Sequence, residues 1–301
     1  MGETLDDEEI RRQLAVTLPE EGESEIDPTL RYSRIRATLD QHAETVRNES
    51  VGEPDSAGSD GLETLDDDFD VEIEEHLDSG GAGHIYLATQ APFGREVVVK
   101  CVRDPEQASS GEHDVREEGI VTGLLDHPGV VPVYNVSSEG AERQAIVMKH
   151  IRGRSLYELL ASRGRDDKEE VEGKQWSFGE LIEVLVDVCH AVEFAHSRGV
   201  VHCDLKPRNI MVGDYGDTYL IDWGLALYLG EDETGERVRT EVDESSPMGT
   251  PAYMAPEMVK PSRDGLSERT DQFLLGAILH RLVTGQPPYR GESLVETIAE
   301  A

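Results

Sequence analysis

The spacing of apolar residues along the chain changes twice, and this change constrains the fold more than any other feature. Residues 69–102 hold three short runs in which apolar and polar side chains alternate, with glycine between the first two runs. Such runs predict β-strands joined by tight turns. Residues 178–197 and 269–284 repeat apolar side chains every three or four positions, which predicts long helices. The sequence therefore predicts an α+β fold, with a small strand-rich part before a larger helical part.

Residues 1–68 differ in composition from the rest of the chain. Weak helical spacing occurs at 6–16 and 28–46, and residues 48–68 are rich in Ser, Gly, Pro and Asp, which is typical of a linker. Either the helices dock a partner or the rest of the chain, or the segment is a mostly disordered acidic extension. We favour the extension. Residues 164–176 are charged and predict an exposed loop between two helices.

Charge and cysteine content exclude several classes of protein. The 301-residue chain has 28 Lys and Arg against 63 Asp and Glu, a net charge of −35, so no nucleic-acid partner is expected. The three cysteines form no CxxC pair, and no apolar run has the about 18 residues that a membrane span needs. We expect a cytoplasmic protein. The acidity fits either a salt-adapted organism or an acidic bacterial protein from a GC-rich genome.

The glycine cluster at residues 77–88 indicates a possible phosphate site. Gly80, Gly81 and Gly83 fall between the first two predicted strands, where missing side chains would let backbone N–H groups approach phosphate oxygens. Lys100 ends the third run, on the strand face that it shares with Val98. A lysine beneath such a loop could pair with phosphates. An ordinary glycine hairpin and a surface lysine are the alternative.

Two later segments carry groups suited to phosphoryl transfer. Asp204, Lys206 and Asn209 lie close together on a segment that Pro207 prevents from being a continuous helix. An aspartate can accept a hydroxyl proton, a lysine can neutralise a phosphoryl group, and an asparagine can ligate magnesium. Asp222 ends an apolar run, so it could hold a hard cation through oxygen or only form a turn.

In this order, the segments resemble the eukaryotic-type (Hanks-type) Ser/Thr protein kinases. The segments HPGVVPVY and VGDYGDTYLIDWGLA are similar to the sequences of the large bacterial multidomain members. The resemblance covers residues 69–301 and implies a bilobal kinase fold, with a β-rich N-lobe at 69–151, a helical C-lobe at 152–301 and an extension at 1–68. It also implies ATP and Mg²⁺, and transfer of the γ-phosphoryl group to Ser or Thr of a protein substrate.

The resemblance assigns a role to each site residue. The catalytic positions would be Lys100, Glu118, Asp204 and Lys206, and the Mg²⁺ ligands would be Asn209 and Asp222. Asp204 would accept the hydroxyl proton, and Lys206 would stabilise the transferring phosphoryl group. Lys100 would hold the α and β phosphates and pair with Glu118, although the adjacent Glu117 could compete. The nucleotide would lie against Leu77, Gly80, Gly81, Gly83, Ile85, Val98, Met148, Ile151 and Met211.

Three positions after the catalytic segment also match the family. Thr250, in GTPAYMAPE, would contact the substrate region, and Glu257 would be a structural anchor. Asp271 would be a buried acid that braces the catalytic loop. The possible autophosphorylation sites are Thr240, Ser245 and Ser246.

The sequence departs from the family pattern at several positions. Asp78 replaces the first loop glycine, which is expected to weaken ATP binding, and Trp223 replaces a phenylalanine that packs under the regulatory helix. Cys203 stands where regulated kinases carry an arginine that receives a phosphate, so phosphorylation is not expected to be the dominant switch. This cysteine is either redox-sensitive or a small buried filler. Beyond residue 301 the family has further helices and an arginine partner for Glu257, so the C-lobe is expected to be truncated.

Two other functions fit part of the pattern. A pseudokinase or nucleotide-binding scaffold would explain Asp78 and Cys203, but the complete set of catalytic residues argues against it. A small-molecule phosphotransferase on the same fold is the other alternative, and the GTPAYMAPE segment favours protein substrates instead.

Overall fold

The computed structural model describes residues 69–80, 83–102, 115–138, 141, 144–163, 176–230, 239–291 and 293–301. The helices expected at 6–16 and 28–46, the linker at 48–68, Gly81 and nearly all of the charged segment at 164–176 lie outside the described residues. The predicted boundaries of the extension and of the two lobes stay predictions.

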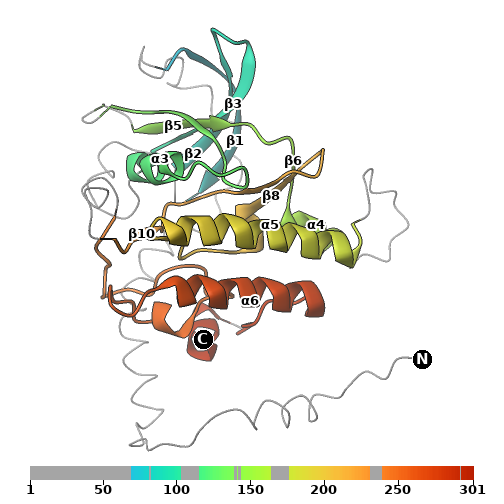
Figure 1. The fold of residues 1–301 in the computed structure, drawn as a ribbon, viewed down its shortest axis with the longest axis vertical. Coiled ribbons are helices and arrows are strands. Elements are labelled where there is room, and N and C mark those ends of the chain that lie inside the picture. Colours follow the sequence, from blue (N-terminus) through green and yellow to red (C-terminus); the bar gives the residue numbers. More distant parts are fainter. Residues whose placement is uncertain are drawn as a thin grey trace, which may run out of the picture. The chain divides into compact units, whose positions relative to one another are not determined.

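The N-terminal part is a five-stranded antiparallel sheet in the order β1-β2-β3-β5-β4. It lies in the upper part of Figure 1, where β1, β2, β3 and β5 are labelled. Helix α3 (Val115–Leu124) packs against β4 and β5. The three alternating runs form the first three strands, as predicted. The strands are β1 (Val71–Gly80), β2 (Gly83–Gln90), β3 (Arg95–Cys101), β4 (Val133–Val136) and β5 (Ala145–Lys149).

Strand β3 separates a core face from a site face. Val97, Val99 and Cys101 are fully buried in the small core of the sheet, whereas Val98 on the opposite face is only half-buried. Lys100 lies on the face of Val98 and reaches α3. The predicted alternation is confirmed, because a strand sends successive side chains to opposite faces.

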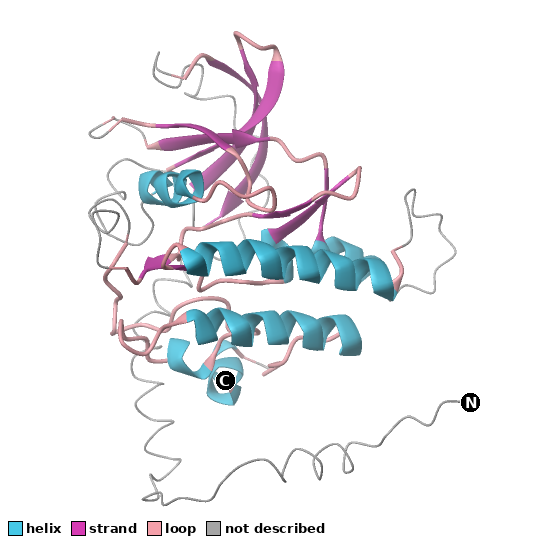
Figure 2. Cartoon of the chain, in the orientation of Figure 1, coloured by secondary structure: helices cyan, strands magenta, loops and turns pink. Residues whose placement is uncertain are grey.

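The C-terminal part is mainly helical, and Figure 2 shows the helices gathered away from the five-stranded sheet. Helix α5 (Phe178–Ser197) forms at the predicted residues, and α6 (Glu268–Thr284) begins one residue earlier than predicted. Ser177 and Glu180 cap α5 reciprocally through their side chains and backbone N–H groups. The other helices are α4 (Leu156–Arg163), α7 (Leu294–Glu300) and the single turns η2 (Pro207–Asn209) and η4 (Pro256–Met258).

Short strands place the loops that carry the polar residues. Strands β6 (Gly153–Ser155), β8 (Ile210–Gly213) and β9 (Thr218–Leu220) form a three-stranded sheet. Strand β10 (Leu227–Tyr228) pairs with β7 (Val200–Val201), which leads directly into the segment that contains Asp204. These pairings bring the segments around Asp204 and Asp222 to one place.

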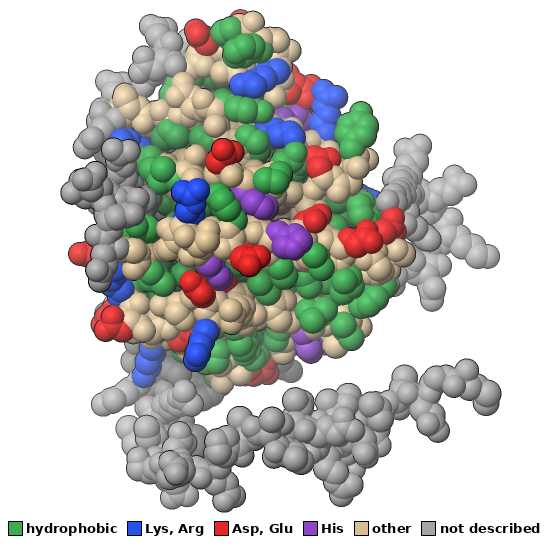
Figure 3. Space-filling view, viewed as in Figure 1, with side chains coloured by type: hydrophobic (Ala, Val, Ile, Leu, Met, Phe, Trp, Pro, Cys, Tyr) green, Lys and Arg blue, Asp and Glu red, His purple; other side chains and the backbone are tan. Residues whose placement is uncertain are grey.

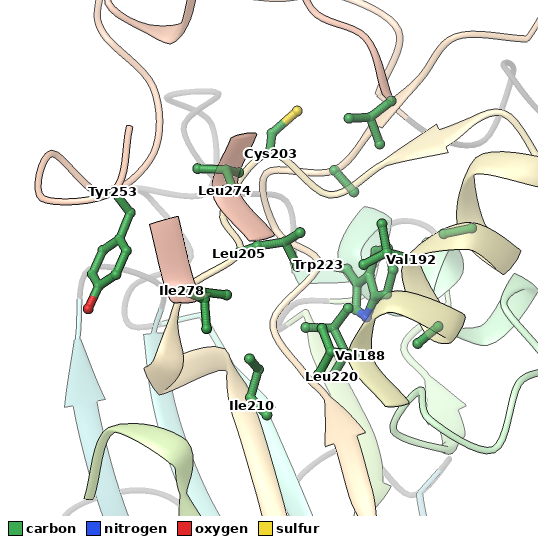
Figure 4. Close-up of a cluster of buried hydrophobic side chains, with 14 of the residues drawn as sticks. Val188, Val192, Cys203, Leu205, Ile210, Leu220, Trp223, Tyr253, Leu274 and Ile278 are labelled. Atoms are coloured by element: carbon green, nitrogen blue, oxygen red, sulfur yellow. The ribbon is translucent and has the colours of Figure 1, made fainter. Parts of the chain in front are cut away.

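The main core lies beneath this site and includes its loops. Figure 4 shows Trp223 against Val188 and Val192 of α5, and it shows Leu205 near Leu274 of α6. Trp223 is 1% exposed, so the indole that replaces the usual phenylalanine is accommodated in the core. The loop that carries Asp204 is therefore anchored by its own apolar side chain, Leu205.

The surface of α6 retains apolar side chains. Phe273, Leu279 and Val283 are exposed, and Figure 3 shows apolar side chains gathered over the helices in the lower part of the view. Among the described residues, no helix combines the length and apolar character needed to cross a membrane.

Candidate active site

Lys100 and Glu118 form a buried ion pair between β3 and α3. The Lys100 Nζ atom lies 2.8 Å from Glu118 Oε1 and 2.6 Å from Oε2, and both side chains are almost fully buried. The helix therefore presents Glu118, and not the adjacent Glu117, to the lysine. Both oxygens of one carboxylate hold the ammonium group, which fixes its position between β3 and α3.

Asp222 completes this group from the C-terminal part of the chain. Its Oδ1 atom lies 3.1 Å from Lys100 Nζ, while its side chain is 36% exposed and so can reach a solvent cation. Asp222 has φ 63°, a left-handed conformation that costs a non-glycine residue about 1–3 kcal/mol. A Cβ at Gly224 would stand 3.3 Å from Glu118 Oε2, so glycine allows these carboxylates to come close.

The ion pairs shift the pKa values of this group. Burial by itself lowers the pKa of Lys100, but the carboxylates of Glu118 and Asp222 outweigh it and raise that pKa above its usual value. Burial also acts to raise the pKa of Asp222, but Lys100, by charge and hydrogen bond, and then Lys206 lower it. Lys100 is thus a permanent cation and Asp222 a permanent anion near neutral pH.

A second polar group forms around Asp204. Lys206 Nζ lies 2.5 Å from Asp204 Oδ2 and 2.9 Å from the hydroxyl of Thr250. That hydroxyl donates to Asp204 Oδ1 at 2.7 Å. Asn209 donates its side-chain N–H to the backbone oxygen of Asp204 at 2.9 Å and to Oδ2 at 3.3 Å. Because the amide nitrogen of Asn209 is engaged, its oxygen is the atom that could ligate a cation.

Asp271 of α6 braces the loop that carries Asp204. It is 1% exposed and accepts hydrogen bonds from the backbone N–H groups of His202 at 2.8 Å and Cys203 at 3.0 Å. His196 Nε2 lies 2.8 Å from the same carboxylate. Cys203 has φ 61°, so Asp271 holds a left-handed residue directly before Asp204.

The buried position of Cys203 favours the filler interpretation. Its side chain is fully buried, and burial, followed by the nearby carboxylates of Asp271 and Asp204, raises the pKa of its thiol well above the usual value. A protonated, inaccessible thiol is a poor nucleophile. The sulfur therefore packs rather than reacts.

Gly83 has a steric role that the sequence pattern does not show. It has φ 119°, and a Cβ there would stand 2.3 Å from the carbonyl oxygen of Cys101. Only glycine fits where β2 begins beside the end of β3. Gly80 pairs with Gly83 at the tip of the β1–β2 hairpin.

The outer side of this hairpin carries a polar cluster. Asp78 accepts a hydrogen bond from the backbone N–H of Ser79 at 2.8 Å. The Ser79 hydroxyl lies 2.7 Å from His76 Nε2 and 2.8 Å from His84 Nδ1, one histidine from each strand. The hydroxyl therefore joins β1 to β2.

Most of the apolar residues expected to hold the nucleotide are half-buried. Val98 pairs with Met148 across β3 and β5, and Ile85 pairs with Lys100 across β2 and β3. Leu77 is exposed, at 45%. Half-buried apolar side chains next to a fully buried core form a surface that a flat ligand could cover. The half-buried members are Ile85, Val98, Met148, Ile151 and Met211.

Glu257 has a partner other than the expected arginine. Its side chain is half-buried, and its Oε1 accepts a hydrogen bond from the hydroxyl of Thr270 at 2.7 Å. Two contributors were not predicted: His196, which supports Asp271, and Arg263, which contacts the segment before Thr250. Both act on residues far away in the sequence, so local spacing gave no signal for them.

The oxygen donors suit a magnesium ion that keeps other ligands. Asn209 and Asp222 offer one amide oxygen and one carboxylate, and in the described part of the chain no three His, Cys, Asp or Glu side chains converge as a metal site. Mg²⁺ commonly takes one or two protein ligands and completes its shell with water and phosphate oxygens. The donor set fits such an ion.

Comparisons with known proteins agree with this geometry. The family model described as a protein kinase domain matches residues 71–301. A probable serine/threonine-protein kinase, CE0033, of Corynebacterium efficiens is 32% identical over 228 residues, which cover 74% of this chain. The serine/threonine-protein kinases PknD of Protochlamydia amoebophila and Chlamydia trachomatis are 29% and 33% identical and cover 83% and 73% of this chain.

The relatives are much longer than this chain. The matched region spans 32% of the Corynebacterium efficiens protein and 25% of each PknD protein. The family model nevertheless covers every element from β1 to α7, including both polar groups described above. The chain therefore belongs to the protein kinase domain family.

Proposed function

We propose that the chain is a Ser/Thr protein kinase that transfers the γ-phosphoryl group of ATP to protein hydroxyl groups. The observation that carries the proposal is the convergence of two charged groups: Lys100 with Glu118 and Asp222, and Asp204 with Lys206. Phosphoryl transfer depends mainly on alignment and charge neutralisation, which these groups supply. Residues 69–151 act as the N-lobe and 152–301 as the C-lobe.

Each side chain has a specific task in this proposal. Lys100, oriented by Glu118, binds the α and β phosphate oxygens, and the half-buried apolar surface receives the adenine. Asp204 accepts the proton of the substrate hydroxyl as that oxygen bonds to phosphorus and the bond to the leaving ADP oxygen breaks. Lys206 neutralises negative charge on the transferring phosphoryl group. Asn209 and Asp222 hold Mg²⁺, which when bound neutralises phosphate charge.

The substrates follow from the same reasoning. Lys206 stands two positions after the proposed base Asp204, and a lysine at this position is typical of Ser/Thr kinases. The relatives named above are serine/threonine-protein kinases. We propose protein Ser and Thr as acceptors, with possible autophosphorylation at Thr240, Ser245 and Ser246. Nucleic acid is not a proposed partner, and a cytoplasmic location is proposed for this part of the protein.

The direct test is transfer of phosphate from ATP with Mg²⁺ to casein and to the chain itself, read by mass spectrometry. Asp204→Asn and Asp222→Ala should each lower transfer by about 10²–10⁴-fold, because each removes a group acting in the transition state. Asp264→Asn, at an exposed acid, is the matched control. Equal transfer by wild type and Asp222→Ala would contradict the proposal, as would a preference for aminoglycosides or choline over casein.

A further inference from the structure

Arg263 links the two described parts of the segment that runs from Asp222 to Glu257, here called the activation segment. Its Nη1 atom donates to the carbonyl oxygen of Tyr228 at 3.1 Å and to that of Thr240 at 2.9 Å. Tyr228 lies in the first described part, residues 222–230, and Thr240 lies in the second, residues 239–257, here called the returning end. Arg263 itself lies outside the segment, between η4 and α6.

Both parts that Arg263 links are connected to the candidate active site. Tyr228 belongs to β10, which pairs with β7, and β7 leads into the loop of Asp204. The Tyr228 N–H also donates to the carbonyl of Arg239 at 2.8 Å. After Thr240 the segment reaches Thr250, whose hydroxyl contacts Asp204. The position of Thr250 thus depends on how the returning end is held.

The returning end is held a second time near Gly249. The Met248 N–H donates to the carbonyl of Met258 at 3.0 Å. Gly249 has φ 88°, and a Cβ there would stand 3.1 Å from the carbonyl oxygen of Cys203. The segment therefore lies directly against the residue before Asp204.

The charges at this contact disfavour a phosphate beside Cys203. The charged groups that act on this thiol are the carboxylates of Asp271, Asp204 and Glu257 and the guanidinium of Arg239. A phosphate there would meet these three carboxylates against the one guanidinium of Arg239, and Cys203 itself supplies no cation to receive it. Ser245 is also engaged, since its hydroxyl and N–H both contact Asp243 Oδ1, at 2.6 and 2.9 Å.

We propose that Arg263 is a positioning residue that holds the activation segment in its substrate-accepting conformation through two backbone carbonyls, without a phosphate on the segment. The inference rests on the proposed kinase function. A guanidinium suits this task, because it stays charged and its several N–H groups can serve separate acceptors. The two carbonyl acceptors are present whether or not the segment is phosphorylated. Arg263 therefore holds the activation segment in every phosphorylation state.

The first test separates positioning from folding. Arg263→Ala should raise the KM for a peptide substrate, or lower its kcat, so that kcat/KM falls about tenfold, while the KM for ATP changes little. Arg263→Lys should recover part of the loss, because the lysine ammonium keeps the positive charge but lacks the planar set of N–H donors of the guanidinium. Arg269→Ala, at an exposed arginine of α6, is the control and should match wild type. An unchanged peptide kcat/KM in Arg263→Ala would overturn the proposal.

The second test asks whether a phosphate on the activation segment is needed to hold the segment in its substrate-accepting conformation. Wild type treated with phosphatase, and a Thr240→Ala/Ser245→Ala/Ser246→Ala triple variant, should keep their kcat/KM for the peptide. Loss of activity in either, to the level of Arg263→Ala, would overturn the proposal and make Arg263 a phosphate receptor. If Arg263→Ala is too unstable to assay, hydrogen exchange in Arg263→Lys should show faster exchange at Met248 than wild type; equal rates would overturn the proposal. Absence of transfer by wild type would instead refute the kinase function itself.

Discussion

Thr250 donates a hydrogen bond from its hydroxyl to the carboxylate of Asp204, although the two residues are 46 positions apart. The same hydroxyl accepts a hydrogen bond from Lys206, which also contacts the second oxygen of Asp204. One threonine thus aligns the proposed base with the proposed phosphoryl-stabilising lysine. It also ties the activation segment to the catalytic loop.

Replacing Thr250 by Val should therefore lower kcat more than it lowers stability. The change removes the hydroxyl at nearly constant volume, and a hydrogen bond to a charged group contributes about 1.5–3 kcal/mol, or about 10- to 150-fold in rate. Thr250→Ser, which keeps the hydroxyl, should retain most of the activity. Steady-state kinetics with a peptide would check this, and equal kcat for the Val and Ser variants would contradict it.

Glu118→Gln should weaken ATP binding through Lys100. The neutral amide cannot hold the buried ammonium as the carboxylate does, so Asp222 alone would orient Lys100. We expect the Kd for ATP to rise about tenfold or more, as measured by calorimetry. In a double-mutant cycle with Lys100→Met, the two losses should be far from additive. Additive losses would show that the pair is not a functional unit.

The pKa of Asp222 predicts a pH dependence of stability. Its folded-state pKa lies below the ordinary value of 3.8, so its contribution is fully present above pH 3.8 and is lost as the pH falls through the lowered pKa. The difference in unfolding free energy between wild type and Asp222→Asn should therefore shrink from pH 6 towards pH 3. Asparagine is chosen because it tolerates the left-handed φ of this position. A difference that stays constant over this range would contradict the assignment.

Asp271→Asn should destabilise the protein strongly. The carboxylate is buried and accepts three hydrogen bonds, and disrupting a buried charged group of this kind costs about 3–5 kcal/mol. Urea unfolding would measure the loss, with Asp264→Asn as the exposed control. His196→Ala should cost less, because the two backbone donors to Asp271 remain. A loss below about 1 kcal/mol for Asp271→Asn would mean that the loop is held by its apolar side chains.

The net charge of −35 makes a prediction about salt. If the acidity is an adaptation to salt, the melting temperature should rise towards molar KCl, because the screening length shortens to about 3 Å at 1 M and relieves repulsion. Sucrose at matched osmolarity is the control for effects that do not depend on charge. A flat or falling melting temperature would favour an ordinary acidic bacterial protein.

Local pattern determined much of the fold. The period-two alternation in β3 places Lys100 on the face opposite to that of Val97 and Val99, because a shift by one residue would put the lysine among the apolar side chains of the sheet core, away from Glu118. The three-and-four spacing located α5 and α6 to within one residue at each end. The resemblance to the kinase family favoured Glu118 over Glu117 as the partner of Lys100, and the contact between Lys100 and Glu118 agrees.

Only the tertiary structure decided the contacts that join distant segments. Thr250 meets Asp204, Arg263 meets Thr240, and Gly83 lies against the carbonyl of Cys101, none of which a local pattern indicates. These contacts depend on how loops close over a packed core, and a hydrogen bond or a steric limit acts over only a few ångströms. The sequence by itself therefore determined the strand face on which Lys100 lies and indicated the residues that are proposed to carry the chemistry. Packing decided which of them touch.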